Sequence, residues 1–166
     1  RRGVAVRPVD FVHWDDPIIG ETLEGFDGVF LLPSSDAMPD ALLERLRTAP
    51  VPLVMLDKDL SHLGIRSIDT CTPRFYQRLM DHLAELGHRR IDLLNTQPLN
   101  DNMRRRIEQW QIWRCAKGID GELFERHVET YGNAMVRAYD VTGELLDSGR
   151  LGGTALLCTT SSAAMG

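Results

Sequence analysis

The chain has 166 residues, 43% of them hydrophobic, and a formal net charge of -5, a composition typical of a folded globular protein. The acidic balance argues against a nucleic-acid-binding surface over the whole chain, because duplex binding depends on clustered Lys and Arg. The sequence has no apolar run of about 18 residues and no signal with an apolar core, so we expect no membrane segment and a cytoplasmic protein or a piece of one.

The sequence contains no motif that predicts catalysis, a metal site or a cofactor. Its cysteines, Cys71, Cys115 and Cys158, lack the paired spacing of a zinc site or a disulfide framework, so we interpret them as reduced thiols. There is no Gly-x-Ser-x-Gly elbow and no phosphate-binding Gly-x-x-x-x-Gly-Lys loop. We therefore expect a protein that is not an enzyme, with an α/β enzyme as a third possibility.

The first part of the chain predicts alternating strands and helices. Residues 4–6 are expected to form a short strand, and Asp15 and Asp16 before Pro17 favour a helix start. The apolar run at residues 29–32 predicts a strand buried on both faces. The elements that follow are a helix, a strand, a polar loop and a strand, at residues 41–46, 51–56, 57–63 and 65–68.

Residues 82–94 combine the end of a helix, a stop and a strand. The helix is expected to start at Pro73 and to face the core with Phe75, Tyr76, Leu79, Met80, Leu83 and Leu86. Gly87 should end it, because only a residue without Cβ adopts the left-handed conformation cheaply. Residues 91–94 then read as a strand.

The last part of the chain continues this alternation. Asn100 or Asp101 can cap a helix that ends before Gly118. Three further elements are expected: a strand at residues 127–130, a helix at 135–146 interrupted by Gly143, and a strand at 154–158. Residues 121–126 are ambiguous. The alternation implies right-handed crossovers and parallel sheets, and so the α/β class.

These elements resemble the effector-binding domain of the LacI/GalR family of transcriptional regulators. The matching motifs are the Asp27-Gly28 pair before an apolar strand, the strand at residues 51–57, the Gly87-His88-Arg89-Arg90 crossing, Arg106-x-x-x-Trp110, and the strand and turn at 155–166. The resemblance implies an α/β protein of two periplasmic-binding-protein-like lobes, at residues 1–88 and 89–166. It also implies an incomplete copy that lacks the central strand of the N-terminal lobe, which should leave unpaired strand edges and bare apolar faces.

The resemblance implies effector-binding residues just beyond the carboxyl ends of strands, where open parallel sheets place their ligands. These residues are Arg106, Ser161, Asn95, Thr160 and Trp14. The sequence alone leaves alternatives open. The neighbouring Arg104 and Arg105 can point into water, the hydroxyls of residues 159–162 can cap the next helix, and Trp14 can be a core residue. His88 is expected to serve the helix-to-strand crossing rather than catalysis.

The chain departs from the family pattern at several positions. Gln109 stands where the family has Gly, which puts close helix packing in doubt. Thr160 and Ser161 stand where the family has Asn and Asp. Without that carboxylate, a different or more acidic effector than an ordinary hexose is expected. The Asp that precedes the family's long helix corresponds to Cys71 or, with a small shift, to Asp69.

The function implied is the effector-sensing and dimerisation domain of a LacI-type DNA-binding regulator. A sugar or sugar acid would bind between the two lobes, and a homodimer would form through apolar positions of residues 41–47. Operator DNA would be contacted through a head domain absent from this chain. The alternative is a periplasmic solute-binding protein for sugar transport, which an upstream secretion signal would distinguish.

Overall fold

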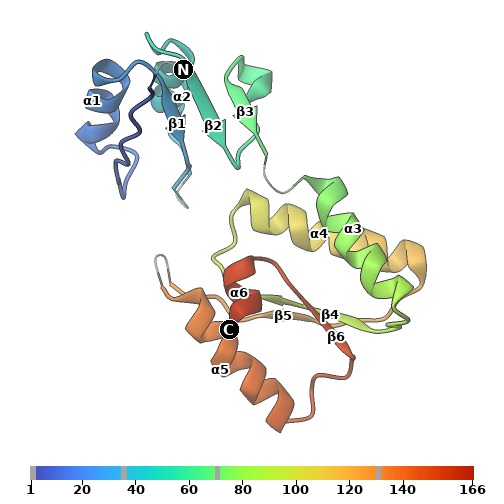
Figure 1. Cartoon of the computed structure of the whole chain (residues 1–166). Coiled ribbons are helices and arrows are strands. Elements are labelled where there is room, and N and C mark those ends of the chain that lie inside the picture. Colours follow the sequence, from blue (N-terminus) through green and yellow to red (C-terminus); the bar gives the residue numbers. More distant parts are fainter. Residues whose placement is uncertain (1–2, 35–36, 70–71, 130–131) are drawn as a thin grey trace. The chain divides into compact units, whose positions relative to one another are not determined.

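The computed structural model describes residues 3–34, 37–69, 72–129 and 132–166, and the chain divides into two compact units, Arg1–Thr70 and Cys71–Gly166 (Figure 1). Each unit contains a three-stranded parallel sheet with helices, which confirms the predicted α/β class. The lobe boundary after residue 88, which the resemblance implies, stays a prediction. The compact units divide earlier because helix α3 (Pro73–Glu85) packs on helix α4 (Asp101–Lys117) of the second unit.

The sheet of the first unit has the strand order β1-β2-β3. Its elements are α1 (Pro17–Gly25), β1 (Val29–Leu31), α2 (Asp40–Arg47), β2 (Leu53–Leu56), the 3-10 turn η1 (Ser61–Leu63) and β3 (Arg66–Ile68). Helix α1 begins where the sequence predicts, because the Asp16 carboxylate accepts the N–H of Ile18 at 3.0 Å. In the parallel register, Val54 of β2 lies opposite Phe30 of β1 and Arg66 of β3.

The two helices of the first unit bury one face of its sheet. Their side chains join the strands in a core that includes Ile19, Leu23, Leu31, Leu42, Leu46, Leu53 and Met55. Strands added in one direction through right-handed crossovers receive their helices on the same face. The second face stays bare, with Phe30 72% and Ile68 50% exposed.

Two predictions for the first unit are therefore wrong. The strand at residues 29–32 is not buried on both faces, because no helix among the described residues of this unit covers the second face. Residues 4–6 form no strand, since no neighbouring strand pairs with them, and Val4 and Val6 are 84% and 88% exposed. The bare apolar face expected of an incomplete copy is present.

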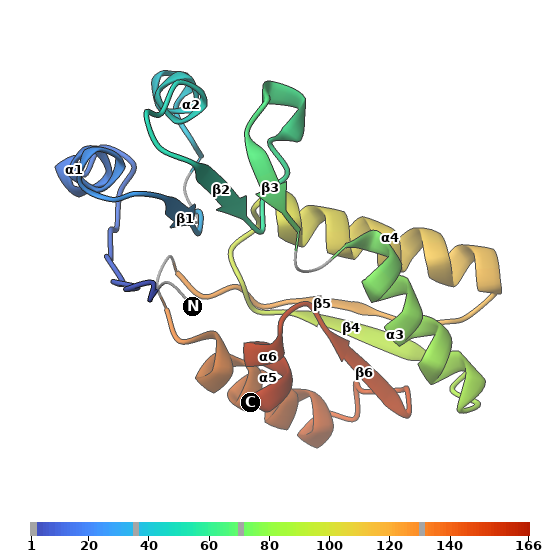
Figure 2. The ribbon, with the colours of Figure 1, turned by 45° about the horizontal axis from the view of Figure 1, so that its top comes forward.

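The sheet of the second unit has the order β5-β4-β6, with β4 in the centre. After α3 come β4 (Ile91–Asn95), α4, β5 (Leu123–Glu125), α5 (Ala134–Asp147), β6 (Ala155–Cys158) and α6 (Ser161–Met165). Helices α3 and α4 cover one face of this sheet, and α5 and α6 cover the other (Figures 1 and 2). All five residues of β4 are buried, as a central strand between two helical layers requires.

The alternation of side chains along β4 divides the core of the second unit into two parts. Ile91 and Leu93 pack with Trp110 and the other apolar residues of α3 and α4. Leu94 points the opposite way and packs with Phe124 and the buried residues of α5 and α6. Both parts of the core hold β4 in place between the helical layers.

The predicted stop of helix α3 is confirmed. Gly87 has φ +96°, its N–H donates to the carbonyl of Ala84 at 3.0 Å, and the N–H of His88 donates to the carbonyl of Leu83 at 3.2 Å. This pair of bonds is a Schellman motif, which needs a residue tolerant of positive φ. The strand predicted at residues 91–94 follows directly as β4.

Several details of the second unit differ from the predictions. Tyr76 and Met80 are buried as expected, but Phe75, Leu79 and Leu86 are 58%, 46% and 64% exposed, because α3 turns only one stripe toward α4 and the sheet. The strand expected at residues 127–130 forms earlier, as β5, where Phe124 reaches the core. Residues 127–129 are not a strand, and Thr130 lies outside the described residues. Gly143 does not interrupt α5.

Candidate functional site

Strand β4 carries a polar group at each end of its apolar stretch. Near its start, the fully buried Asp92 accepts the N–H of Glu122 at 2.8 Å and the N–H of Gly153 at 3.2 Å. The same carboxylate pairs with the guanidinium of Arg90 at 3.1 Å. Asp92 thus ties the segments leading into β5 and β6 to the central strand. This arrangement fixes which residues meet at the carboxyl edge of the sheet.

The crossing from α3 to β4 is tied to the same end of the sheet. The ring nitrogen Nδ1 of His88 lies 2.7 Å from the Thr154 hydroxyl, next to the start of β6. Arg90 also lies 3.6 Å from Asp120 and 3.7 Å from Glu122. The Gly-His-Arg-Arg motif therefore has a structural role in joining strands.

A buried polar layer closes the carboxyl edge of the second sheet. Asn95 and Thr96 are fully buried and Thr159 is 2% exposed. The Thr159 hydroxyl donates to the Asn95 side-chain oxygen at 2.7 Å, which also accepts the N–H of Gln97 at 3.2 Å. The hydroxyl of Thr96 donates to the carbonyl of Ala134 at 3.2 Å. These bonds satisfy the layer internally, as buried polar groups require.

Arg106 reaches this layer from helix α4. The helix is capped by Asn100, whose side chain accepts the N–H of Met103 at 3.0 Å, and Asp101 stands in its first turn. One turn further along, the half-buried Arg106 donates from Nη1 to the carbonyl of Thr159 at 2.6 Å. A guanidinium is thereby anchored on the residue that directly follows β6.

The hydroxyls after β6 divide into two kinds. Thr160 is the N-cap of α6 and accepts the N–H of Ala163 at 3.2 Å. The capping interpretation is therefore correct for Thr160. Ser161 begins α6 and is exposed, and its hydroxyl makes no hydrogen bond to the described part of the chain. Arg106, Asn95, Thr160 and Ser161 thus all stand at one edge of one sheet.

Comparison with solved structures identifies the fold. The trehalose repressor of Escherichia coli matches with a TM-score of 0.68 and 22% identity, over 89% of this chain and 53% of the repressor. A LacI family transcriptional regulator from Enterococcus faecium with bound ribose matches with a TM-score of 0.64 and 25% identity, over 88% of this chain and 52% of that chain. The Cra regulator of Pseudomonas putida in complex with fructose 1-phosphate matches with a TM-score of 0.64 and 15% identity, over 92% and 57% of the two chains.

The chain has the fold of a LacI-family effector-binding domain. It spans about half the length of the regulators that it matches, and so it is a partial copy of that fold. No protein-family model and no curated protein matches the sequence. The fold named from the sequence motifs is confirmed by the structural neighbours.

Trp14 is a core residue of the first unit of this LacI-type fold. It is 8% exposed, its ring lies 5.1 Å from that of Phe11, and it packs among the helix residues of that unit. The ligand-binding role proposed for Trp14 from the sequence remains a prediction, alongside the core role that the burial supports.

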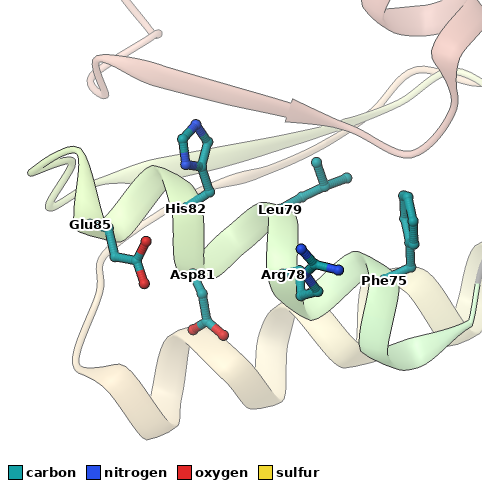
Figure 3. A pocket seen from close by; sticks show the side chains of 6 residues that line it. All are labelled: Phe75, Arg78, Leu79, Asp81, His82 and Glu85. Atoms are coloured by element: carbon teal, nitrogen blue, oxygen red, sulfur yellow. The ribbon is translucent and has the colours of Figure 1, made fainter.

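A separate groove lies on the surface of the second unit, along helix α3 (Figure 3). It has a volume of about 670 Å³ and is lined by Phe75, Arg78, Leu79, Asp81, His82 and Glu85. Trp113 Nε1 donates to the Asp81 carboxylate at 2.9 Å and Lys117 Nζ lies 3.3 Å away, and these contacts lower the pKa of Asp81 below its ordinary value. All six lining residues belong to α3, and none of them belongs to the carboxyl edge of the sheet.

The cysteines and potential metal ligands of the described residues form no further site. Cys115 and Cys158 are free thiols, and burial raises the pKa of Cys158. Cys71, which we aligned with the family's Asp, lies outside the described residues. Within the described ranges, no group of three His, Cys, Asp or Glu side chains could hold a metal ion. Nor does any helix there have the length and apolarity to cross a membrane.

The sequence predicted only some of the residues at the carboxyl edge of the second sheet. Asn95, Thr160 and Ser161 could be found because each follows an apolar strand. Thr96 and Thr159 were missed as members of a connected layer, because their partners are the carbonyl of Ala134 and the side chain of Asn95. These pairings join residues far apart in the chain, and no local pattern predicts them.

Proposed function

We propose that this chain is the effector-sensing part of a LacI-type transcriptional regulator, and that a small sugar-like molecule contacts the carboxyl edge of its second sheet. Two regulators of similar fold were solved with ribose and with fructose 1-phosphate. In this proposal the ligand contacts Arg106 and Ser161. Asn95 supports the site by holding the edge in shape through its hydrogen bonds to Thr159 and Gln97. The protein would act on transcription in the cytoplasm and not as an enzyme.

One observation carries this proposal. Arg106 is anchored at 2.6 Å on the backbone carbonyl that follows β6, so its guanidinium is held where parallel sheets place their ligands. An arginine fixed by one hydrogen bond retains several N–H donors in a fork that suits hydroxyl or acidic oxygens. Ser161 adds an exposed hydroxyl at the same edge.

Signalling, in this proposal, follows from the general thermodynamics of ligand-linked change. A ligand shifts a conformational equilibrium only by its differential affinity for the two states. The closing of two lobes around the effector, and contact with operator DNA through a separate head domain, are proposals for the whole protein.

Self-association is also part of the proposal, but through a surface other than residues 41–47. Of the apolar side chains of α2, Leu42 and Leu46 are buried and Leu43 is partly buried in the core of their own unit. Helices α5 and α6 instead expose Met135, Tyr139, Leu146 and Met165, at 42%, 71%, 63% and 71%. Exposed large apolar side chains that gather on one surface commonly mark protein interfaces. We expect the homodimer contact to include this surface.

A thermal-shift screen of sugars, sugar acids and sugar phosphates tests the proposed function. The parent protein should be stabilised by at least one member, since a ligand that binds only the native state raises the melting temperature. Arg106→Ala should lose about 1.5–3 kcal/mol of binding energy, or roughly ten- to a hundredfold in affinity.

Arg104→Ala provides the matched control, because Arg104 also donates to a single backbone carbonyl, that of Leu99 at 3.3 Å, but is exposed. This variant should bind as the parent does. Equal loss of binding in both variants, or binding that neither change affects, would contradict the assignment of the site.

A further inference from the structure

Three hydrogen-bond acceptors at the carboxyl edge of the second sheet are already engaged. The side-chain oxygen of Asn95 accepts from the N–H of Gln97 and the hydroxyl of Thr159. The hydroxyl oxygen of Thr160 accepts the N–H of Ala163, and the carbonyl of Thr159 accepts from Arg106. A ligand that has to donate hydrogen bonds therefore finds few unoccupied acceptors in this layer.

Several hydrogen-bond donors at the same edge have no acceptor among the described residues. A guanidinium has five N–H groups, and the hydrogen bond from Arg106 to the carbonyl of Thr159 uses one of them, on Nη1. The O–H of Thr160 remains able to donate, because its capping bond involves only the oxygen. The hydroxyl of Ser161 makes no bond within the described ranges of the chain. The Ser161 hydroxyl can accept as well as donate, but the N–H groups of Arg106 leave the edge with more free donors than free acceptors.

The positive charge of Arg106 also has no counter-charge in the part of the chain that the structure describes. No carboxylate among the described residues forms an ion pair with it. At the end of β5, Glu125 lies 3.4 Å from His127, and the exposed Asp101 stands in the first turn of α4. Taking a half-buried cation out of water is unfavourable unless an anion pairs with it.

We propose that the effector is an anionic sugar derivative, whose carboxylate or phosphate binds Arg106. This inference rests on the proposed function and specifies its ligand. A sugar hydroxyl donates as well as accepts hydrogen bonds, so a neutral sugar is best held where a carboxylate accepts from it. A carboxylate or phosphate only accepts, and it matches the fork of a guanidinium with two parallel bonds. The donor-rich edge of this chain fits the second kind of ligand.

Matched ligand sets separate these two classes. Binding to the protein is measured by titration calorimetry for glucose, glucuronate and glucose 6-phosphate, and for ribose and ribose 5-phosphate. We expect at least one acid or phosphate to bind ten times or more tightly than its neutral parent sugar. The glucuronate and phosphate arms distinguish a carboxylate from a phosphate as the anion.

Two substitutions test whether Arg106 causes the preference. Arg106→Ala should remove the preference for the anion. Arg106→Lys should retain part of that preference, because lysine keeps the positive charge but lacks the paired N–H donors of a guanidinium. Ser161→Asp adds an acceptor and a negative charge at the same edge, and it should weaken anion binding at least tenfold. Far-UV circular dichroism verifies that each variant is folded, and the exposed Arg104→Ala serves as the control that should change nothing.

The outcomes distinguish this inference from the proposed function. A neutral sugar that binds more tightly than its acid and phosphate, and loses affinity in Arg106→Ala, would overturn the anionic class and leave the sensing role intact. An anion preference that survives in Arg106→Ala would overturn the inference as well. If no ligand of either set binds, both the inference and the proposed function are contradicted.

Discussion

Replacing Asp92 by Ala should destabilise the second unit more than any surface change, because this carboxylate joins three segments. It is fully buried, and its partners are the N–H groups of Glu122 and Gly153 and the guanidinium of Arg90, at 2.8, 3.2 and 3.1 Å. A hydrogen bond to a charged group contributes about 1.5–3 kcal/mol, and breaking a buried ion pair from one side costs about 3–5 kcal/mol.

The expected loss for Asp92→Ala is about 3–5 kcal/mol and not the sum of three full bonds. Arg90 is 32% exposed at its side chain, so water can replace part of its contact. Asp92→Asn keeps the shape and one acceptor oxygen but loses the charge, and it should cost roughly half as much as Asp92→Ala.

Urea unfolding followed by circular dichroism measures this change as a lower midpoint. Glu44→Ala is the control, because Glu44 forms an exposed ion pair with Arg47 within α2, and its removal should leave the midpoint almost unchanged. If Asp92→Ala shifted the midpoint no more than Glu44→Ala, the carboxylate would not tie the strands together. The role assigned to the amino edge of the sheet would then be refuted.

Three further predictions concern other parts of the second unit. Gly87→Ala should cost about 1–2 kcal/mol in urea unfolding, because φ is +96° while no atom crowds the new Cβ, and an unchanged midpoint would contradict this. Trp113→Phe should destabilise the protein at pH 7 and much less at pH 3. The hydrogen bond from Trp113 lowers the pKa of Asp81 in the folded protein. The stability that this bond contributes is therefore present above the unfolded pKa of about 3.9, and it is lost as the pH falls through the lower folded pKa. An equal loss of stability in Trp113→Phe at both pH values would show that the hydrogen bond to the ionised Asp81 is not the cause. Tyr139→Lys should shift the whole protein toward monomer in sedimentation velocity, whereas Ala41→Lys, at an exposed position of α2, should not. The reverse result would return the dimer contact to residues 41–47.

Local sequence signals predicted the second unit well where they act through the backbone. Gly87 and Gly118 end their helices in the left-handed conformation, and Asn100 caps α4, as the sequence indicated. Such signals operate within a few residues and do not depend on the rest of the fold. The central strand β4 was also predictable, because its apolar run is bounded by a helix stop and a polar loop.

Predictions that depended on distant packing were less accurate. Helix α3 carries more apolar residues than its contact with α4 and the sheet can bury, so Phe75, Leu79 and Leu86 remain exposed. The sequence showed the apolar stripe but not its width. The position of β5 depended in the same way on which residue reaches the core, and Phe124 does so rather than residues 127–129.

The positions of four candidate residues at one edge of the sheet were predictable, but the hydrogen bonds that join them were not, and their role as a site stays a prediction. The sequence indicated one shared edge because Asn95, Thr160 and Ser161 lie at or just after the ends of apolar strands. Arg106 lies in the helix that follows the first of these strands. The sequence could not show that the side-chain oxygen of Asn95 accepts hydrogen bonds from Thr159 and Gln97. Nor could it show that Arg106 donates to the carbonyl of Thr159. These contacts join separate strands and helices, and they decide which groups are left for a ligand.

The most direct test of the account is a crystal structure of the protein bound to a ligand selected in the thermal-shift screen. The account predicts ligand oxygens within hydrogen-bond distance of Arg106 and Ser161, with the guanidinium still anchored on Thr159. A ligand bound elsewhere, for example in the groove along α3 lined by Leu79 and His82, with Arg106 making no contact to it, would contradict the central claim.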